Sequence, residues 1–157
     1  MPSASGKIGA EAAPGRRENC KEECEMLNEN VTKVLSENLW SIATVCEKGW
    51  PNVVPVAFRA VLPDGTLAVG DVFLDRTLKN LTASEGRIAV SAFDAATHEG
   101  YQIKGHAVYV TEGEVVADFK AAAEKLFGGR MTAKGAVLIT PEKVIVTTPG
   151  PDNKKEL

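Results

Sequence analysis

Apolar residues recur at steps of three and four along the segment from Asn19 to Asn38. This spacing gives one apolar face and predicts an amphipathic helix. The preceding residues, 1–18, are rich in Ala, Gly, Ser and Pro and have no such periodicity, so they are interpreted as a flexible N-terminal tail. The apolar positions of the helix are Cys24, Leu27, Val31, Val34 and Leu35.

After residue 38 the pattern changes to short runs rich in Val and other strand-forming residues, separated by turn residues. Three strands are predicted over Leu39–Cys46, Asn52–Leu62 and Thr66–Gly70, and together they indicate an antiparallel meander. Pro55 lies inside the second run. Because proline has no N–H to donate, it places that strand at a sheet edge or at a bulge.

The second half of the chain alternates helical and strand patterns. A short helix begins near Asp75, which is expected to cap it, and a second helix covers Glu114–Phe127 before two glycines. Hairpin-connected strands with a few helices indicate a closed antiparallel barrel rather than a doubly wound sheet. This barrel is expected to form a single domain over residues 19–152, with 153–157 as a C-terminal tail. The remaining strands are predicted over Arg87–Phe93, Gly100–Thr111, Gly135–Thr140 and Lys143–Thr148, the last two broken by Pro141.

Composition narrows the possible functions. The chain has 157 residues, of which 44% are hydrophobic, enough for one domain with a real core. Its 18 basic and 21 acidic residues leave no basic excess, so nucleic acid is not an expected partner. No apolar run is long enough to span a membrane. Three cysteines suggest a reducing, cytoplasmic compartment, and with two histidines they leave little material for a metal site or a nucleophilic triad. Any chemistry would therefore rely on a cofactor.

The few cysteines and histidines have ordinary interpretations beside functional ones. Cys20 and Cys24 are four apart on the predicted helix; they would form a redox pair, half a metal site or, as favoured here, simply one helix face. His98 and His106 have no second histidine at ligand spacing, which favours a structural or solvated role for both. The sequence also lacks GxGxxG, GxxxxGK[ST], HExxH, CxxC and GxSxG motifs.

The segment Phe73–Asn80 carries a more distinctive pattern. It places Arg76 and Thr77 in the first turn of a short helix, directly after a strand. Free backbone N–H groups and the positive helix end favour an anion there, and the arginine side chain adds donors suited to phosphate oxygens. Arg59, in a preceding strand, is a candidate to reach the same place. The alternative is a surface helix with ordinary charges.

Taken in order, six segments resemble the small FMN-binding split-barrel flavoproteins related to pyridoxamine 5′-phosphate oxidase. The resemblance covers about Val31 to Asp152, and it lies in the ordered set rather than in any single motif. The segments are Gly49–Arg59, Asp75–Leu81, Arg87–Ser91, Gly100–Gly105, Lys134–Val137 and Pro149–Asp152.

The resemblance implies a mainly β fold: a six-stranded antiparallel split β-barrel of Greek-key character with peripheral helices. It also implies a homodimer with two FMN sites at the subunit interface. In each site, the FMN phosphate would lie on Arg76 and Thr77, helped by Arg59, while backbone groups of two segments would hold the isoalloxazine. Gln102 is a further cofactor-binding candidate on the same basis. The two segments are Val56, Ala57 and Phe58, and Asp71, Val72 and Phe73.

The chain departs from the oxidase itself at its end. Residues 149–157 contain no arginine or histidine of the kind that binds pyridoxal phosphate in the oxidase, so oxidation of pyridoxamine phosphate is not expected. The favoured function is an FMN-dependent oxidoreductase acting on a small molecule, with no catalytic side chain assigned. The alternatives are a non-enzymatic FMN carrier, store or redox sensor, a haem-binding split barrel with His98 and His106 as its axial candidates, and a barrel without a cofactor.

Overall fold

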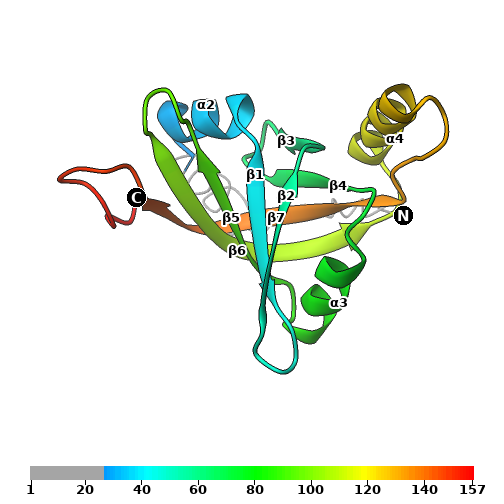
Figure 1. Ribbon diagram of the computed structural model, residues 1–157, viewed down its shortest axis with the longest axis horizontal. Helices are drawn as coiled ribbons and strands as arrows, with labels where there is room; N and C mark the ends of the chain where they lie inside the picture. Colours follow the sequence, from blue (N-terminus) through cyan, green and yellow to red (C-terminus); the bar gives the residue numbers. More distant parts are fainter. Residues whose placement is uncertain (1–26) are drawn as a thin grey trace, which may run out of the picture.

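A computed structural model describes residues 27–157 of the chain (Figure 1). The expected tail over 1–18, Cys20, Cys24 and the first part of the expected N-terminal helix lie outside the described residues. Within them, helix α2 covers Glu29–Glu37 and buries Val31, Val34 and Leu35, as its periodicity predicts. The side chain of Asn28 caps this helix by accepting a hydrogen bond from the Val31 amide at 3.1 Å.

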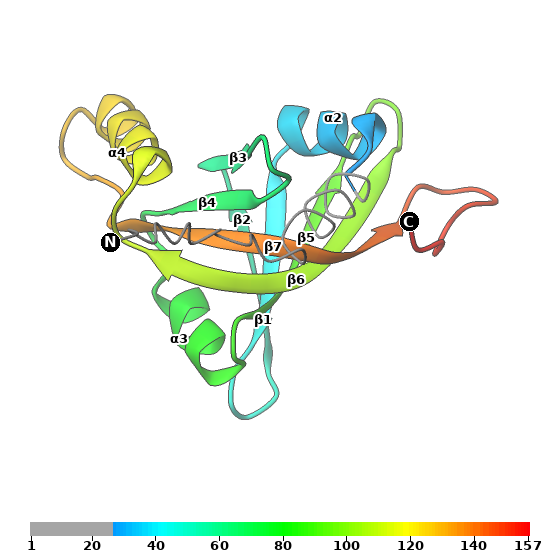
Figure 2. The same ribbon diagram turned by 180° about the vertical axis from the view of Figure 1, so that it is seen from behind.

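The strands form one antiparallel, strongly curled sheet in the order β2-β1-β5-β6-β7-β4-β3 (Figures 1 and 2). Helices α2 and α4 lie at one end of this half-barrel and α3 lies at the other end. The fold is therefore mainly β with peripheral helices, as expected. The strands are β1 (Trp40–Val45), β2 (Pro51–Val56), β3 (Arg59–Val61), β4 (Leu67–Asp71), β5 (Arg87–Phe93), β6 (Gly100–Val110) and β7 (Gly135–Val146), and the other helices are α3 (Asp75–Ala83) and α4 (Glu114–Phe127).

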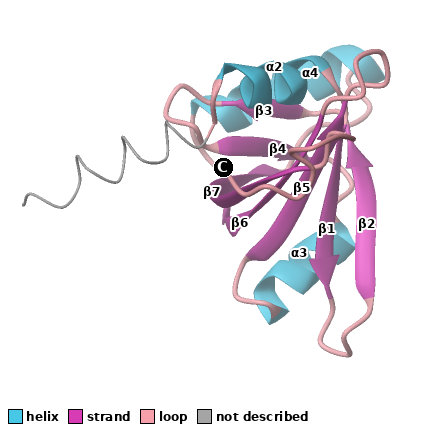
Figure 3. Cartoon of the chain, turned by 90° about the vertical axis from the view of Figure 1, so that its left-hand side faces the viewer, coloured by secondary structure: helices cyan, strands magenta, loops and turns pink. Residues whose placement is uncertain are grey.

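The strand predicted over Asn52–Leu62 is wrong as a single element, and the meander is wrong with it. The chain leaves β2 after Val56 and enters β3 at Arg59, and these two strands lie at opposite edges of the sheet. Only Ala57 and Phe58 separate them, so the covalent chain itself joins the two edges (Figure 3). Counted as one bent strand, β2 and β3 give the six strands of a split barrel. Pro55 lies on an edge strand, as predicted.

The two strands predicted on either side of Pro141 are instead one strand, β7. A shift in register between Lys104 and Gly105 places Gly105 opposite Pro141, so the proline lies at an irregularity of the β6–β7 ladder. A proline is tolerated there because the ladder is already interrupted. Strand β5 and helix α4, in contrast, have the predicted bounds.

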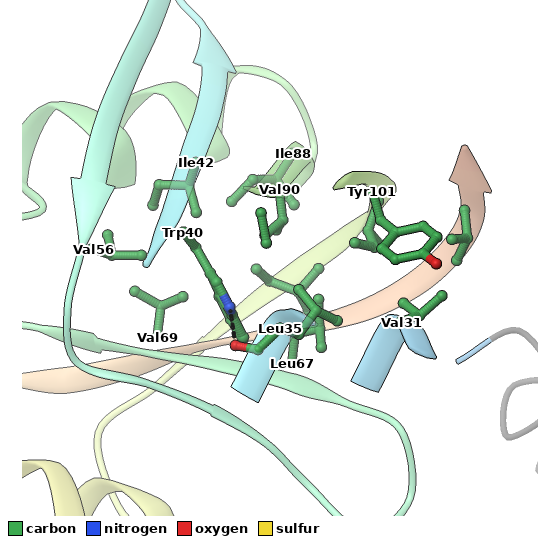
Figure 4. Packing of buried hydrophobic residues seen from close by; sticks show 14 of the residues in the cluster. Val31, Leu35, Trp40, Ile42, Val56, Leu67, Val69, Ile88, Val90 and Tyr101 are labelled. Carbon is green, nitrogen blue, oxygen red and sulfur yellow. Dashed lines mark hydrogen bonds between the residues drawn. The ribbon is translucent and has the colours of Figure 1, made fainter. Parts of the chain in front are cut away.

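The core has two parts, one on each face of the sheet. The larger part lies between the curled sheet and α2, and Trp40 is 1% exposed within it (Figure 4). The indole Nε1 of Trp40 donates to the Leu35 carbonyl at 2.7 Å, which satisfies a carbonyl at the end of α2. The smaller part lies under α4 and contains Val116, Phe119 and Ala123.

The last residues, set apart by sequence as a tail over 153–157, lie against β7. The amide of Lys154 donates to the Val146 carbonyl at 2.8 Å, and the amide of Leu157 donates to the Val144 carbonyl at 2.9 Å. An ion pair of 3.1 Å joins Lys143 to Glu156. These bonds use the edge of β7 that β4 no longer covers.

Candidate functional site

Helix α3 begins directly after β4, and the connection between them determines how its first turn is presented. Leu74 is the N-cap residue, and no side chain caps the helix. The prediction that Asp75 caps it is wrong, because this carboxylate binds the Lys134 ammonium at 3.0 Å instead. The carboxylate that contacts the start of the helix is that of Asp71, whose Oδ1 accepts a hydrogen bond from the N–H of the N-cap residue Leu74 at 3.1 Å.

The first turn of α3 brings Arg76 and Thr77 together as the sequence predicts. The Arg76 side chain is exposed, whereas Thr77 is 2% exposed. The first N–H groups of a helix have no partner inside it, and the helix dipole makes this end positive. With no side-chain cap, these N–H groups and the Arg76 guanidinium form a donor set that suits an anion such as phosphate.

A buried polar contact holds α3 against β1. Asn80 Nδ2 donates to Thr44 Oγ1 at 3.0 Å, and both residues are almost fully buried. Leu81 packs into the main core from the same helix face. The candidate site therefore rests on a helix with fixed placement.

Asp71 connects this turn to the sheet. It is 1% exposed, and while Oδ1 accepts the Leu74 amide, Oδ2 accepts the Tyr109 hydroxyl at 2.8 Å. Burial and this hydrogen bond to the carboxylate raise the pKa of Tyr109 to about 12. No pattern in the sequence pointed to Tyr109, because its role depends on β6 lying close to the end of β4.

Lys134 adds a second cation near the start of α3. Its backbone N–H donates to the Asp71 carbonyl at 2.8 Å, which fixes this part of the connection between α4 and β7. The hydrogen bond to Asp75, followed by the negative charges of Asp71 and Asp75, raises the pKa of the Lys134 ammonium. Two carboxylates and two cations, including Arg76, thus surround one helix end.

The two segments expected to hold a ring system meet at an aromatic cluster. Phe58 and Phe73 both lie against Phe127 of α4, with centroid separations of 6.2 and 6.1 Å. Phe73 is 65% exposed, whereas Val56 and Val72 are buried and present only backbone. Phe127 was not among the sequence candidates, since it was identified only as the last residue of the predicted helix.

The structure does not bring the Arg59 side chain to this helix end. Its Nε donates to the Asn38 carbonyl and its Nη2 to the Ser36 carbonyl at 3.2 Å, both at the C-terminal end of α2. Partial burial lowers the pKa of the guanidinium. Figures 1 and 3 show α2 and α3 at opposite ends of the half-barrel, so the Arg59 side chain, bonded at the end of α2, lies away from the start of α3.

Gln102 is also distant from the first turn of α3 within one chain. It lies opposite Ile145 on β7, whereas Asp71 lies opposite Gly135 at the other end of the same strand. Ten residues of strand separate the two positions, roughly 30 Å at about 3.3 Å per residue. Its neighbours in β6, Tyr101 and Ile103, are buried in the core, so Gln102 faces the other side of the sheet.

The two histidines are exposed. His98 lies in a turn with a φ of 61°, and His106 has its Nδ1 2.5 Å from Glu142 Oε1. Over residues 27–157, no three His, Cys, Asp or Glu side chains are grouped so as to hold a metal ion. No helix in this range is long and apolar enough to cross a membrane.

Comparison with known proteins agrees with this architecture. The family model described as pyridoxamine 5′-phosphate oxidase matches residues 26–150, which is most of the chain. The chain therefore belongs to the pyridoxamine 5′-phosphate oxidase family. No curated protein matches its sequence.

Solved structures show the same fold. HupZ from Group A Streptococcus is 26% identical, with a TM-score of 0.65 over 81% of this chain and 98% of that one. An FMN-binding protein from Syntrophomonas wolfei subsp. wolfei is 15% identical, with a TM-score of 0.69 over 87% and 96%. HutZ, the heme storage protein from Vibrio cholerae, is 17% identical, with a TM-score of 0.58 over 76% and 94%. At the lower identities the likeness concerns the fold alone.

Proposed function

We propose that this protein is an FMN-binding flavoprotein that acts as an oxidoreductase on a small molecule in a reducing, cytoplasmic compartment. The observation that carries the proposal is the uncapped first turn of α3, with Arg76 exposed beside it in a chain of this family. The donor set fits a phosphate group, and Asp75 is already paired with Lys134, which reduces its repulsion of an anion.

The chain's own residues would divide the binding work. Arg76, Thr77 and the first-turn N–H groups would hold the phosphate, while Ala57, Phe58 and Phe73 would lie along the ring. The carbonyls of Ala57, Phe58 and Asp71 already accept hydrogen bonds within the protein, so these segments would bind the polar edge of the isoalloxazine through N–H groups rather than through these carbonyls. When bound, the flavin supplies the redox chemistry, and the protein supplies position and electrostatics. Three further residues are proposed to contact the cofactor: Val56 and Val72 through their backbone, and Gln102.

A homodimer with FMN at the subunit interface would reconcile Gln102 as a cofactor residue with its distance from α3. Within one chain, Gln102 of β6 and Asp71 of β4 pair with opposite ends of β7, so one FMN would not reach both. In such a dimer, Gln102 of the second copy would have to lie near the first copy's α3. Light scattering tests the dimer, and loss of FMN affinity in a Gln102→Ala variant of normal mass tests the shared site.

The direct experiment measures FMN binding by quenching of flavin fluorescence. Arg76→Ala combined with Thr77→Ala should weaken FMN binding about tenfold or more, since a charge-assisted hydrogen bond contributes about 1.5–3 kcal/mol. The control is Lys79→Ala with Thr82→Ala, which removes a cation and a hydroxyl from exposed positions of the same helix; because Thr77 is buried, Arg76→Ala alone is also compared with Lys79→Ala. A wild-type protein that takes up no FMN would refute the proposal. Equal affinities in the two double variants would refute the phosphate assignment.

Turnover separates an enzyme from an FMN carrier or sensor. A flavoprotein that oxidises NADH or NADPH, or reduces a small acceptor, would be an oxidoreductase. Bound FMN without turnover over a panel of donors and acceptors would favour the carrier, store or sensor.

A haem-binding function is the second candidate. It is supported by the likeness in fold to HutZ, a heme storage protein, and by His106, whose Nδ1 contacts Glu142 and whose ring is exposed. A carboxylate at one imidazole nitrogen favours coordination through the other. Haem titration with His98→Ala and His106→Ala tests it. A Soret shift in the wild type that only His106→Ala abolishes would favour haem, and no shift would exclude it.

A further inference from the structure

Asp71 is a buried carboxylate at the end of a strand. It is the last residue of β4, it is 1% exposed, and among the described residues no basic side chain binds it directly. Both of its oxygens are nevertheless satisfied, by the Leu74 amide at 3.1 Å and by the Tyr109 hydroxyl at 2.8 Å. Burying a carboxylate costs free energy, and the hydrogen bonds from these neutral donors offset part of that cost.

Four elements meet at this residue. Asp71 itself belongs to β4, Tyr109 belongs to β6, and Leu74 is the N-cap of α3. The Asp71 carbonyl also accepts the Lys134 amide at 2.8 Å, and Lys134 directly precedes β7. One side chain and one peptide group thus tie the entry of α3 to three strands of the sheet.

The neighbouring strand leaves room for this arrangement. A Cβ atom added at Gly135 would lie 2.6 Å from the Tyr109 hydroxyl oxygen and 2.5 Å from the Val110 carbonyl oxygen. Glycine at this position therefore allows the Tyr109 ring to lie across β7 and reach Asp71. The contact depends on a residue chosen for its lack of a side chain.

We infer that Asp71 is the positioning residue of the anion site: held by Tyr109, its side chain fixes the Leu74 amide and so sets where Arg76 and Thr77 meet a phosphate group. This inference rests on the proposed function. It assigns the Asp71 side chain a role through α3, distinct from a direct contact with the cofactor, because both carboxylate oxygens are already bonded within the protein.

The test compares FMN with riboflavin, which lacks the phosphate. Asp71→Ala should weaken FMN binding about tenfold, the scale of one lost charge-assisted bond, while riboflavin affinity changes less than about twofold. Asp71→Asn keeps an acceptor for Leu74 and should recover most of the FMN affinity. Tyr109→Phe should weaken FMN selectively by a smaller factor. Equal losses for FMN and riboflavin, or no rescue by asparagine, would overturn the inference.

A second measurement does not depend on flavin. In the ligand-free protein, Asp71→Ala should accelerate hydrogen exchange at the Leu74 and Leu78 amides, which bond to Asp71 and to the Leu74 carbonyl. Unchanged exchange at both amides would overturn the inference even if FMN binds. If the wild type binds no FMN but exchange accelerates, the proposed function fails and the positioning of α3 by Asp71 stands.

Asp64→Ala is the matched control. Asp64 Oδ1 accepts the Thr66 amide at 3.0 Å in an exposed turn, a bond of the same kind far from α3 in sequence. This variant should alter exchange at Thr66 alone and leave FMN affinity unchanged. A loss of FMN affinity like that of Asp71→Ala would show that the effect is general and would refute the specific role.

Discussion

The Arg59 guanidinium donates from Nε to the backbone carbonyl of Asn38, the residue that ends α2. Its Nη2 reaches the Ser36 carbonyl at 3.2 Å, so a strand residue closes the C-terminal end of a helix. A cation at this end of a helix opposes its negative dipole and satisfies carbonyls that have no partner within the helix.

Replacing Arg59 should therefore affect stability more than ligand binding. Arg59→Ala should lower the free energy of unfolding by about 1–2 kcal/mol, since partly exposed charge-assisted bonds are lost. Arg59→Lys should recover only part of this, because an ammonium does not reproduce the two-pronged guanidinium. Urea unfolding measures both. A loss of FMN affinity as large as that of Arg76→Ala would instead restore Arg59 to the phosphate site.

The Tyr109 hydroxyl should titrate well above its ordinary range. Its pKa is about 12 in the folded protein, against 10.0 for a free tyrosine, because of burial and then its hydrogen bond to Asp71. Tyrosinate absorbance in a Tyr101→Phe background isolates Tyr109, since the chain has two tyrosines. Asp71→Asn should lower this pKa without returning it fully to 10.0. An unchanged pKa in that variant would contradict the contact.

The same shift predicts the alkaline behaviour of the fold. Between pH 10.0 and about 12, the folded state retains a Tyr109 proton that the unfolded state has released. The stabilisation from this group is therefore complete below pH 10.0 and is lost as the pH rises through about 12. In the Tyr109→Phe variant, the free energy of unfolding should depend less on pH within that window. Chemical unfolding at several pH values measures this dependence, and an equally steep dependence in the variant would contradict the prediction.

Asn52 carries the buried side-chain nitrogen that lacks a hydrogen-bond partner within residues 27–157. Asn52 belongs to the edge strand β2 and lies opposite Thr44 of β1. Replacing an unsatisfied amide by an apolar group of similar size removes a desolvation cost, so Asn52→Leu should raise stability by about 1 kcal/mol. Asn52→Asp should lower it, because a charge would take the place of the amide. Thermal unfolding checks the sign, and a destabilised leucine variant would indicate an unseen partner.

Gly105 should not tolerate alanine. Its Cβ would press against the Thr140 carbonyl of the neighbouring strand and lie 3.3 Å from Ile139 Cγ2. The Thr140 carbonyl cannot move away unless the paired strands also shift. Gly105→Ala should therefore lower the free energy of unfolding by about 1–3 kcal/mol. Lys104→Ala, exposed on the same strand, is the control and should be near neutral in urea unfolding. Equal stabilities would show that the register shift absorbs the methyl group.

Local signals in the sequence predicted the elements that depend on local chemistry. Helix α4 has its predicted bounds because its apolar period runs up to Gly128, which adopts a left-handed conformation at a φ of 59°. The break between β2 and β3 was missed because Ala57 and Phe58 are apolar and carry no turn signal. Pro141 suggested a strand end, and only the irregular pairing with Gly105 explains why β7 continues.

The candidate site divides in the same way. The turn with Arg76 and Thr77 follows from residues close in sequence, and the structure places them together at the start of α3. The destinations of Arg59, Tyr109 and Lys134 depend on partners at least 21 residues away, a separation that no periodicity encodes. Asp75 was mistaken for the cap because the distant Lys134 competes for its carboxylate.

The order of the strands also bears on how the protein is made. Strand β7, the last to leave a ribosome, lies between β6 and β4 and supplies one side of both ladders. Strand β4 pairs with β7 across a sequence separation of about 70 residues. The chain therefore loses the entropy of closing this long loop only late in folding. We therefore expect the sheet to complete only after synthesis passes residue 146, with slow folding and an unpaired β4 edge exposed on the nascent chain until then.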